Sequence, residues 1–168
     1  MSINRYVWGV ANSFQASALI PSRLRSFILR SLGCDIHPDA KIACDVFVGS
    51  SNIRMRSGSF VNTGAFLDGS ALVDIGEGAR IGPYVRILTG SHTYASNEMR
   101  RGPGSIDTNK AVTIERGCWV GMASLIMPGV TVARGCVIGA GSVVTSSTEP
   151  NGLYLGSPAR RVKDLPVD

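Results

Sequence analysis

The sequence predicts an all-β fold, a parallel β-helix in which about five three-sided coils stack into a column with an N-terminal α-helical cap. The first observation behind this prediction is a strict six-residue spacing of aliphatic residues, at Ile114, Val120, Ile126, Val132, Ile138 and Val144. The second is a glycine content of 20 in 168 residues, which indicates many tight turns. A period of six suits neither an amphipathic helix nor an alternating hairpin, but it suits short strands joined by corners.

Earlier parts of the chain repeat this pattern. The same spacing occurs in two further runs, Ile36, Ile42 and Val48, and Ile75, Ile81 and Ile87. Between residues 53 and 72 the spacing slips, at Ile53, Val61 and Leu67, which indicates extra residues at corners. Three strands close a coil of about 18 residues, so Cys118 and Cys136 should lie one above the other. We therefore assign residues 34–156 to the β-helix domain.

Residues 1–33 form a separate helical segment. Pro21-Ser22 predicts a helix start with Ser22 as N-cap, and Gly33 closes this helix. One face of the helix is apolar, and the arginines lie largely away from it; that face comprises Leu24, Phe27, Ile28 and Leu32. Two interpretations stay open, a cap on the open end of the column or a basic helix resting weakly on an anionic membrane surface. Residues 1–20 are apolar enough to pack against another protein surface, such as that of a neighbouring subunit.

The net charge of +5 is concentrated at the two ends of the chain. Residues 1–33 contain four arginines and no acidic residue, and the C-terminal basic tail 157–168 is also positive, whereas residues 34–156 are neutral. A nucleic-acid-binding protein would carry its basic stripe on the folded body, so no nucleic acid is expected as a partner. Since residues 1–20 lack a sustained apolar stretch with a cleavage site, we expect a cytoplasmic protein. The four cysteines are expected to be reduced core residues, without a metal.

His92 is the main candidate for chemistry. It ends the run Ile87-Leu88-Thr89-Gly90-Ser91-His92, after which a polar excursion, loop 93–110, interrupts the six-residue spacing. A histidine where a rigid scaffold gives way to a long loop is typical of a functional site. Position alone leaves two interpretations, a catalytic residue or a structural corner. The second histidine, His37, lies at a turn-like corner of the first coil and is expected to be solvated or to cap the backbone.

The stretch from Asn62 to Arg160 resembles the hexapeptide-repeat acyltransferases, in particular the maltose, galactoside and nodulation-type O-acetyltransferases that use acetyl-coenzyme A. The segments that carry the resemblance are Phe66-Leu67-Asp68, Ile81-Gly82-Pro83, Thr89-Gly90-Ser91-His92, Cys118-Trp119-Val120-Gly121, Met127-Pro128-Gly129-Val130-Thr131-Val132, Ile138-Gly139-Ala140-Gly141-Ser142-Val143-Val144-Thr145 and Gly156-Ser157-Pro158-Ala159-Arg160. This resemblance implies a left-handed coil and a homotrimer with sites between subunits. The overall layout is most similar to acetyltransferases of surface-polysaccharide and lipopolysaccharide pathways.

The resemblance also implies roles for single residues. His92 corresponds to a general base that takes the proton of the acceptor hydroxyl, a task that suits imidazole. Asn62 and Asp68 match residues that hold the hydroxyls of the acceptor, although either side chain can instead satisfy backbone groups at a corner. The residues that match coenzyme A-binding positions are Trp119, Gly121, Met122, Ser142, Arg160 and Arg161.

Within this cofactor set the expected contributions differ. The backbone N–H of Met122 is expected to stabilise the oxyanion of the tetrahedral intermediate. Trp119 stands at the mouth of the site by resemblance, whereas an isolated tryptophan more often serves packing. Arg160 and Arg161, together with Lys163, either bind the phosphates of coenzyme A or remain solvated.

These observations predict an enzyme that transfers an acetyl group from acetyl-coenzyme A to a sugar hydroxyl, directly and without a metal. Three other functions are compatible with a column of this kind. A serine or other small-molecule acetyltransferase shares the column, but serine acetyltransferases typically have a Gly-Gly-Thr-Gly-type loop, which is replaced here by Leu88–His92. A γ-class carbonic anhydrase needs three histidines for each zinc ion, and this chain has two. A non-catalytic β-helix scaffold is the third alternative.

Overall fold

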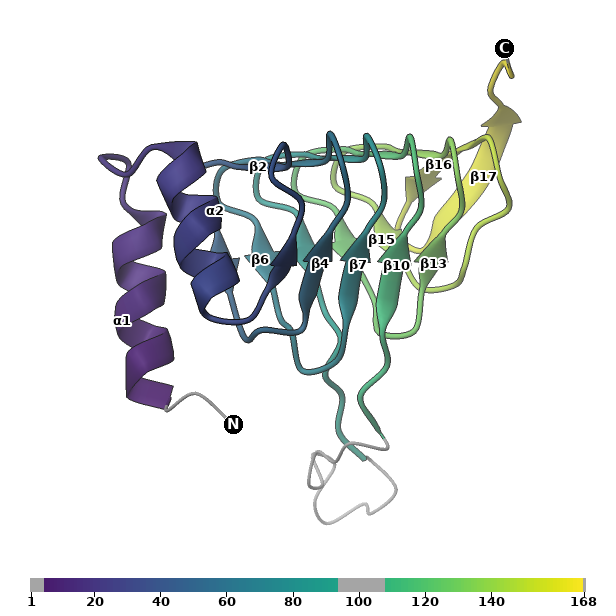
Figure 1. Cartoon of the computed structure of the whole chain (residues 1–168). Helices are drawn as coiled ribbons and strands as arrows, with labels where there is room; N and C mark the ends of the chain where they lie inside the picture. Colours follow the sequence, from purple (N-terminus) through teal and green to yellow (C-terminus); the bar gives the residue numbers. More distant parts are fainter. Residues whose placement is uncertain (1–4, 94–107, 168) are drawn as a thin grey trace.

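A computed structural model describes residues 5–93 and 108–167. It is a three-sided column with two helices at one end and an antiparallel hairpin at the other (Figure 1). Face A consists of β1 (Asp35–Ile36), β4 (Ile53–Met55), β7 (Val73–Ile75), β10 (Val112–Ile114) and β13 (Thr131–Val132). Face B consists of β2 (Lys41–Ile42), β5 (Phe60–Val61), β8 (Arg80–Ile81), β11 (Trp119–Val120), β14 (Val137–Ile138), β16 (Gly152–Gly156) and β17 (Ala159–Asp164). Face C consists of β3 (Phe47–Val48), β6 (Phe66–Leu67), β9 (Arg86–Ile87), β12 (Leu125–Ile126) and β15 (Val143–Val144).

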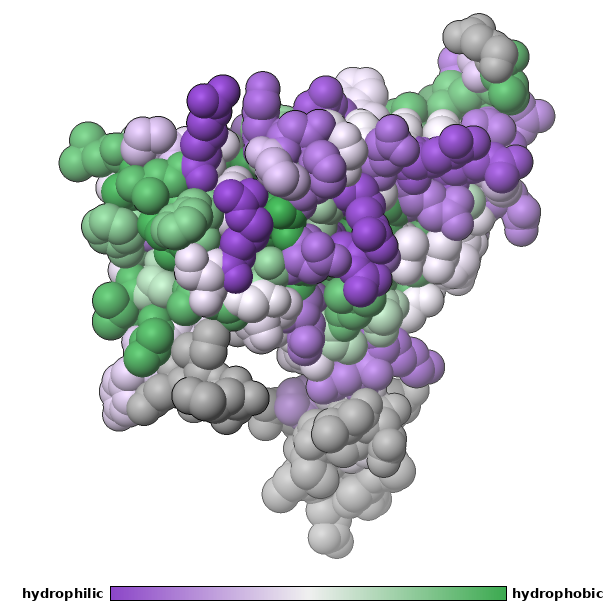
Figure 2. All heavy atoms as spheres, in the orientation of Figure 1, coloured by the Kyte–Doolittle hydropathy of each residue, from purple (hydrophilic) through white to green (hydrophobic). Residues whose placement is uncertain are grey.

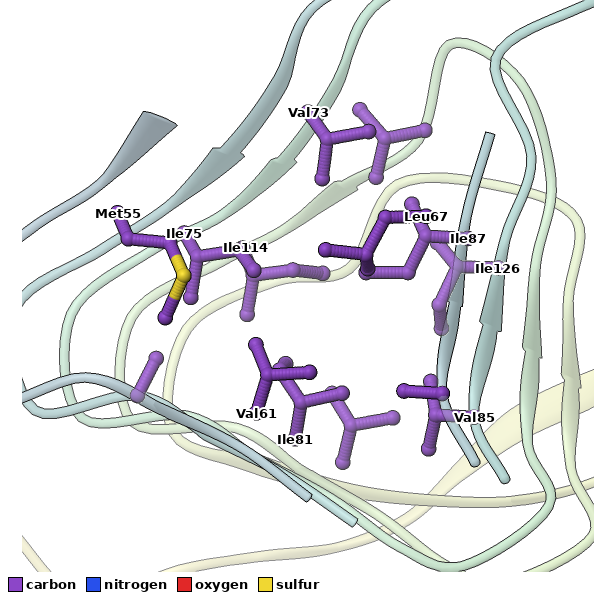
Figure 3. Packing of buried hydrophobic residues seen from close by; sticks show 14 of the residues in the cluster. Met55, Val61, Leu67, Val73, Ile75, Ile81, Val85, Ile87, Ile114 and Ile126 are labelled. Carbon is purple, nitrogen blue, oxygen red and sulfur yellow. The ribbon is translucent and has the colours of Figure 1, made fainter. Parts of the chain in front are cut away.

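Each coil contributes one strand to every face, and neighbouring strands within a face are parallel except for the antiparallel pair of β16 and β17. Five coils therefore make up the column, which confirms the predicted parallel β-helix. The last residue of each short strand points inward, and equivalent residues of successive coils stack, as Met55, Ile75 and Ile114 do (Figure 3). These side chains are at most 1% exposed, and burial of such an aliphatic side chain contributes about 1.5–3 kcal/mol.

The strand register explains why the six-residue spacing slips. Paired residues are 18 apart from Ile114 to Val132, but 19 apart from Ile36 to Met55 and 20 apart from Met55 to Ile75. Met55, not Ile53, is thus the residue equivalent to Ile36, and within each coil the spacing of six is kept. The extra residues all fall at the corner between faces C and A, where the long excursion also leaves the column (Figure 1).

Three of the four cysteines are buried as predicted, whereas Cys44 is only half-buried. Trp119 pairs with Val137, and the Trp119 N–H donates a hydrogen bond to the Cys136 carbonyl at 2.9 Å, so Cys118 and Cys136 hold equivalent positions in successive coils. All four cysteines are free thiols. Burial raises the pKa of Cys34 and of Cys118 to about 12, as expected of core residues.

Helix α1 (Arg5–Ala16) covers the open edge of the first coil. The side chain of Asn12 accepts a hydrogen bond from the Val48 N–H at 3.0 Å and donates one to the Val48 carbonyl at 2.6 Å. The Gln15 amide donates to the Val46 carbonyl, and the Trp8 indole N–H donates to Val48, each at 2.6 Å. The helix therefore satisfies backbone groups that a further strand would otherwise pair. Residues 1–20 were expected only to pack on another surface, and the surface that α1 covers is the first coil of the same chain.

Helix α2 (Ser22–Ser31) packs against the column with a different face from the one predicted. Leu24 and Phe27 are 43% and 58% exposed, whereas Arg25, Ser26 and Leu29 are buried. The guanidinium group of Arg25 donates hydrogen bonds to four backbone carbonyls, those of Gln15, Ser17, Ile20 and Ile42. The prediction that this arginine lies away from the packed face was wrong, because its five N–H donors satisfy the carbonyls where α1, its following turn and the first coil meet.

The ends of α2 also differ in part from the prediction. Ser22 is the first helical residue rather than the N-cap, since Pro21 holds the N-cap position and no side chain caps the helix. Gly33 does close the helix, with a left-handed φ of 94°.

The outer surface of the cap is apolar (Figure 2). The exposed residues that make up this surface are Tyr6, Val7, Val10, Phe14, Leu19, Leu24 and Phe27. Since Arg25 is buried, fewer basic residues are available to an anionic membrane surface than the sequence suggested. Within residues 5–93 and 108–167, no helix is long and apolar enough to span a bilayer.

The predicted C-terminal tail turns back on the column. Residues 157–158, joined by a cis peptide bond between Ser157 and Pro158, form the turn of a hairpin, and β17 pairs antiparallel with β16. Since β16 in turn pairs with β14, the basic residues of the tail are fixed against the end of face B.

Candidate active site

The carboxylate of Asp68 organises the corner from which the excursion leaves the column. Its Oδ2 accepts hydrogen bonds from the Thr89 N–H and hydroxyl, each at 2.9 Å, and from the Gly90 N–H at 2.6 Å. Its Oδ1 accepts one from the Ser70 hydroxyl at 3.0 Å. Partial burial acts to raise the pKa of Asp68, but these hydrogen bonds outweigh it and lower the pKa below its ordinary value. Asp68 is therefore ionised, and it binds backbone N–H and hydroxyl groups of the same chain.

Further hydrogen bonds close the base of the excursion, which we call the neck and define as residues 89–91 and 108–110. The Lys110 N–H donates to the Thr89 carbonyl at 2.8 Å, and the Thr108 hydroxyl donates to the Ser91 carbonyl at 2.9 Å. The side chain of Asn109 accepts a hydrogen bond from the Ser91 N–H at 3.3 Å. These hydrogen bonds connect the two segments of the neck to each other and to the column.

His92 follows the neck directly and is exposed. Because the neck is held by Asp68 and closed by Thr108 and Asn109, the backbone that leads into His92 is fixed on a rigid column. Most of the predicted loop 93–110 lies outside the described residues. The other histidine, His37, is exposed in the first coil beside the Asp39 carboxylate, as the sequence predicted.

Asn62 lies at a different corner, between faces B and C. It follows β5 and is half-buried, and its side-chain oxygen accepts a hydrogen bond from the Thr63 N–H at 2.8 Å. Asp68 and His92 lie at the corner between faces C and A. A single chain therefore places Asn62 and His92 on opposite edges of face C and does not bring them together.

The cofactor candidates on β11 lie one coil further along the column. Trp119 is 57% exposed on face B, between Arg80 and Val137 of the neighbouring strands. Gly121 is buried, and a Cβ atom built on it would lie 2.6 Å from the Ala140 nitrogen, so only glycine fits this close approach. Met122, at the corner between faces B and C, is 51% exposed. Trp119 and Met122 thus present side chains to solvent around one edge of the column.

The remaining cofactor candidates are Arg160, which is exposed, and Arg161 and Ser142, which form hydrogen bonds with other segments of the chain. Arg160 is exposed on β17. Arg161 donates hydrogen bonds to the Asp164 carboxylate at 2.6 and 2.9 Å and to the Glu149 carbonyl at 3.0 Å. Its hydrogen bonds to Tyr154 and then to Asp164 raise the pKa of Arg161. Ser142 is 1% exposed, and its hydroxyl accepts a hydrogen bond from the Gly156 N–H at 3.1 Å, which anchors the hairpin.

Two features of this region were missed in the sequence. The neck residues Thr108 and Asn109 precede the point where the aliphatic spacing resumes, and their position opposite Thr89–Ser91 was the available signal. Tyr84 occupies a corner position where other coils have Gly64 or Gly141, and this exchange of glycine for a large residue was also visible. Among the described residues, no cluster of three or more His, Cys, Asp and Glu side chains is placed to hold a metal ion.

Comparison with known proteins identifies the family. The family model described as bacterial transferase hexapeptide (six repeats) matches residues 111–146. Nodulation protein L of Rhizobium meliloti is 37% identical over 138 residues, which cover 80% of this chain and 72% of that protein. Two other curated relatives, from Dictyostelium discoideum and Schizosaccharomyces pombe, are matched over only 60% and 54% of their own length.

Solved structures show the same architecture. A hexapeptide-repeat-containing acetyltransferase from Vibrio cholerae superposes with a TM-score of 0.84 at 28% identity, covering 97% of this chain and 91% of that one; it has also been solved in complex with acetyl-coenzyme A. A maltose O-acetyltransferase from Clostridium difficile superposes with a TM-score of 0.83 at 25% identity, covering 97% and 87%. With its five-coil column, its helical cap and these relatives, the chain belongs to the hexapeptide-repeat acetyltransferase family.

Proposed function

We propose that the chain transfers the acetyl group of acetyl-coenzyme A to a hydroxyl group of a sugar, with His92 as the general base. The observation that carries the proposal is the position of His92, exposed immediately beyond a hydrogen-bonded neck on a rigid column. The relative named as a maltose O-acetyltransferase and the acetyl-coenzyme A complex of the Vibrio cholerae relative support this donor and this class of acceptor.

The reaction needs one group that can take and return a proton. A sugar hydroxyl is a weak nucleophile at neutral pH, so the His92 imidazole accepts its proton as the oxygen attacks the thioester carbonyl carbon. The tetrahedral intermediate collapses when the C–S bond breaks, and the imidazolium returns the proton to the leaving thiolate. The acetyl group passes directly to the acceptor, so no acyl-enzyme intermediate and no metal take part.

The outward side chains of face C support completion of the site by a second copy. The outward side chains of this face form a largely apolar ladder of Phe47, Phe66, Arg86, Leu125 and Val143. The first two rings stack with their centroids 4.7 Å apart, and Phe47 is 44% exposed. Face A instead carries an ion-pair ladder in which Arg54 contacts Asp35 at 3.0 Å and Asp74 at 3.4 Å. Face C therefore gains more than face A from burial against other copies.

Threefold association through face C completes the active site. In a trimer with parallel columns, the corner between faces B and C of one subunit meets the corner between faces C and A of the next. This arrangement brings Asn62 of one subunit toward His92 of the partner subunit, which a single chain cannot do. We include the homotrimer and the intersubunit site in the proposal.

Coenzyme A binds along the column, from the fourth coil to the hairpin. Trp119 and Met122 present exposed side chains to its pantetheine arm, the Met122 N–H stabilises the oxyanion, and Gly121 allows the close backbone approach that this edge requires. Arg160 is the exposed cation for a phosphate group. Ser142 and Arg161 contribute by holding the hairpin that carries Arg160.

The acceptor belongs to sugars of cytoplasmic surface-polysaccharide or lipopolysaccharide precursors in this proposal. The test is a free-thiol release assay with acetyl-coenzyme A and a panel of nucleotide sugars, free sugars, serine and aminoglycosides. A sugar should be acetylated, and serine as the sole acceptor would overturn the proposal. Lack of thermal stabilisation by acetyl-coenzyme A would instead favour a scaffold.

The role of His92 is tested in the same assay. His92→Ala should lower turnover at least about 100-fold while the affinity for coenzyme A stays the same, because a general base contributes about 10²–10⁴-fold. His37→Ala, at the exposed histidine of the first coil, is the matched control and should retain activity. Near-normal turnover of His92→Ala would exclude His92 as the base.

A further inference from the structure

One corner of the column repeats a left-handed backbone conformation in every coil. It is the corner between faces B and C, and the residues with positive φ are Asp45 (59°), Gly64 (69°), Tyr84 (57°), Ala123 (57°) and Gly141 (69°). Glycine adopts this conformation freely, whereas a residue with a large side chain does so only at a cost in free energy. Tyr84 is the one large residue of the set, so the fold keeps a bulky side chain where the backbone favours glycine. Such strain is typical of functional positions.

The ring of Tyr84 is supported from one side and open on the other. A Cβ atom built on Gly64 would lie 2.3 Å from Tyr84 Cδ1 and 2.4 Å from Cε1, so the ring lies directly on the glycine of the preceding coil. The Tyr84 N–H also donates to the Thr63 carbonyl at 2.9 Å. The residue is nevertheless 49% exposed. This combination gives a fixed aromatic ring that presents a surface to solvent.

The position of Tyr84 relates it to both halves of the candidate site. Asn62 lies at the same corner, one coil nearer the cap, and Met122 lies there one coil nearer the hairpin. Tyr84 and His92 both belong to the third coil, since they follow β8 and β9. In a trimer of parallel columns joined through face C, Tyr84 therefore stands at the same level as His92 of the partner subunit.

We propose that the Tyr84 ring is a platform for the acceptor sugar and helps to determine acceptor specificity, a deduction that rests on the proposed function. A pyranose presents an apolar C–H surface that packs on an aromatic ring, while its hydroxyls need polar partners such as Asn62. The platform holds the sugar on the side opposite the base, so that one hydroxyl points to the imidazole. Tyr84 binds and orients the acceptor and takes no part in proton transfer.

Steady-state kinetics of four purified variants, with the acetylated sugar of the wild type as acceptor, test this platform. Tyr84→Phe keeps the ring and should keep the acceptor KM within about twofold. Tyr84→Leu and Tyr84→Asn remove the ring and should raise the acceptor KM about tenfold, with the KM for acetyl-coenzyme A unchanged. The asparagine variant also relieves the backbone strain, because asparagine tolerates the left-handed conformation. Its melting temperature should therefore be at least that of the leucine variant.

Asp45→Gly is the matched control, since it relieves the same conformation at the same corner in the first coil, away from the site. It should change the melting temperature without changing the acceptor KM. If Tyr84→Leu shows the acceptor KM of an active wild type, the platform is refuted while the proposed function stands. If the wild type acetylates no sugar at all, the proposed function fails and the platform with it.

Discussion

Asp68 and Thr89 are joined by two hydrogen bonds to one carboxylate oxygen, one from the backbone N–H and one from the hydroxyl, each 2.9 Å long. The two residues lie 21 positions apart in the chain and meet because successive coils stack. Through this pair the second coil holds the segment that leads to His92. Asp68 is therefore a positioning residue in this structure.

Replacement of Asp68 should impair catalysis more than folding. In the folded protein one carboxylate oxygen of Asp68 accepts three hydrogen bonds, and Asp68→Asn removes the negative charge that strengthens them. The neck then loses its fixed geometry, and kcat should fall about 10- to 100-fold. The KM for acetyl-coenzyme A should stay unchanged because Trp119 and Met122 lie on another edge. Asp39→Asn is the matched control, since Asp39 also accepts a backbone N–H, that of Gly58 at 3.1 Å, but in the first coil. Equal kcat values for the two variants would contradict the positioning role.

The stability that Asp68 contributes should depend on pH in a defined direction. Its pKa is lowered in the folded protein, so the contribution is fully present above the unfolded value of about 3.9 and is lost as the pH falls through the folded value. Urea unfolding of the wild type and Asp68→Asn should give a constant difference in the free energy of unfolding above about pH 5. This difference should shrink in more acidic buffer. A difference that grows on acidification would show that the pKa is raised instead.

Arg25 should be among the most important residues for the stability of the cap. Arg25→Met keeps the apolar stem but leaves four carbonyls without their donor, and the free energy of unfolding should fall by about 3–5 kcal/mol. Arg23→Met, at an exposed position of the same helix, should change it by no more than about 0.5 kcal/mol. Denaturant unfolding of both variants measures this contrast, and similar losses in the two would argue against the buried role of Arg25.

Glycine substitutions should have opposite effects in the column and in the cap. Gly121→Ala would place a Cβ atom 2.6 Å from the Ala140 nitrogen and 2.7 Å from the Ile138 carbonyl oxygen, so the variant should lose about 1–3 kcal/mol. Gly9→Ala, inside α1 with no atom within 4 Å of the added Cβ, should gain up to about 1 kcal/mol. Melting temperatures of the two variants show whether each substitution stabilises or destabilises the protein. A Gly121→Ala protein as stable as the wild type would show that neighbouring coils can separate locally.

The column could be predicted from the sequence because its information is local and repeated. Ile114, Val120 and Ile126 each fill an equivalent position on a different face, and the same rule applies coil after coil. Met55 does not stand out in a pattern of Ile, Leu and Val, although it lies six positions before Val61. The six-residue spacing within a coil is therefore kept in the second coil as well.

The cap could not be predicted in the same way, because its packing depends on groups far apart in the chain. The amphipathic pattern of α2 pointed to Leu24 and Phe27 as the packed residues, but the carbonyls near Ile42 required a donor, and Arg25 supplies it. The candidate site was likewise only partly predictable. His92 and Asp68 can be singled out in the sequence as candidates, whereas their connection through the neck depends on how coils of unequal length stack.

The single corner that carries every extra residue has an evolutionary consequence. The chain leaves the column after β9 on face C and returns in β10 on face A, where Val112 to Ile114 still pair directly with Val73 to Ile75 of the preceding coil. A longer or shorter segment can be inserted there without shifting any strand. Relatives can therefore differ in the length of this one insert while every strand of the column keeps its pairing.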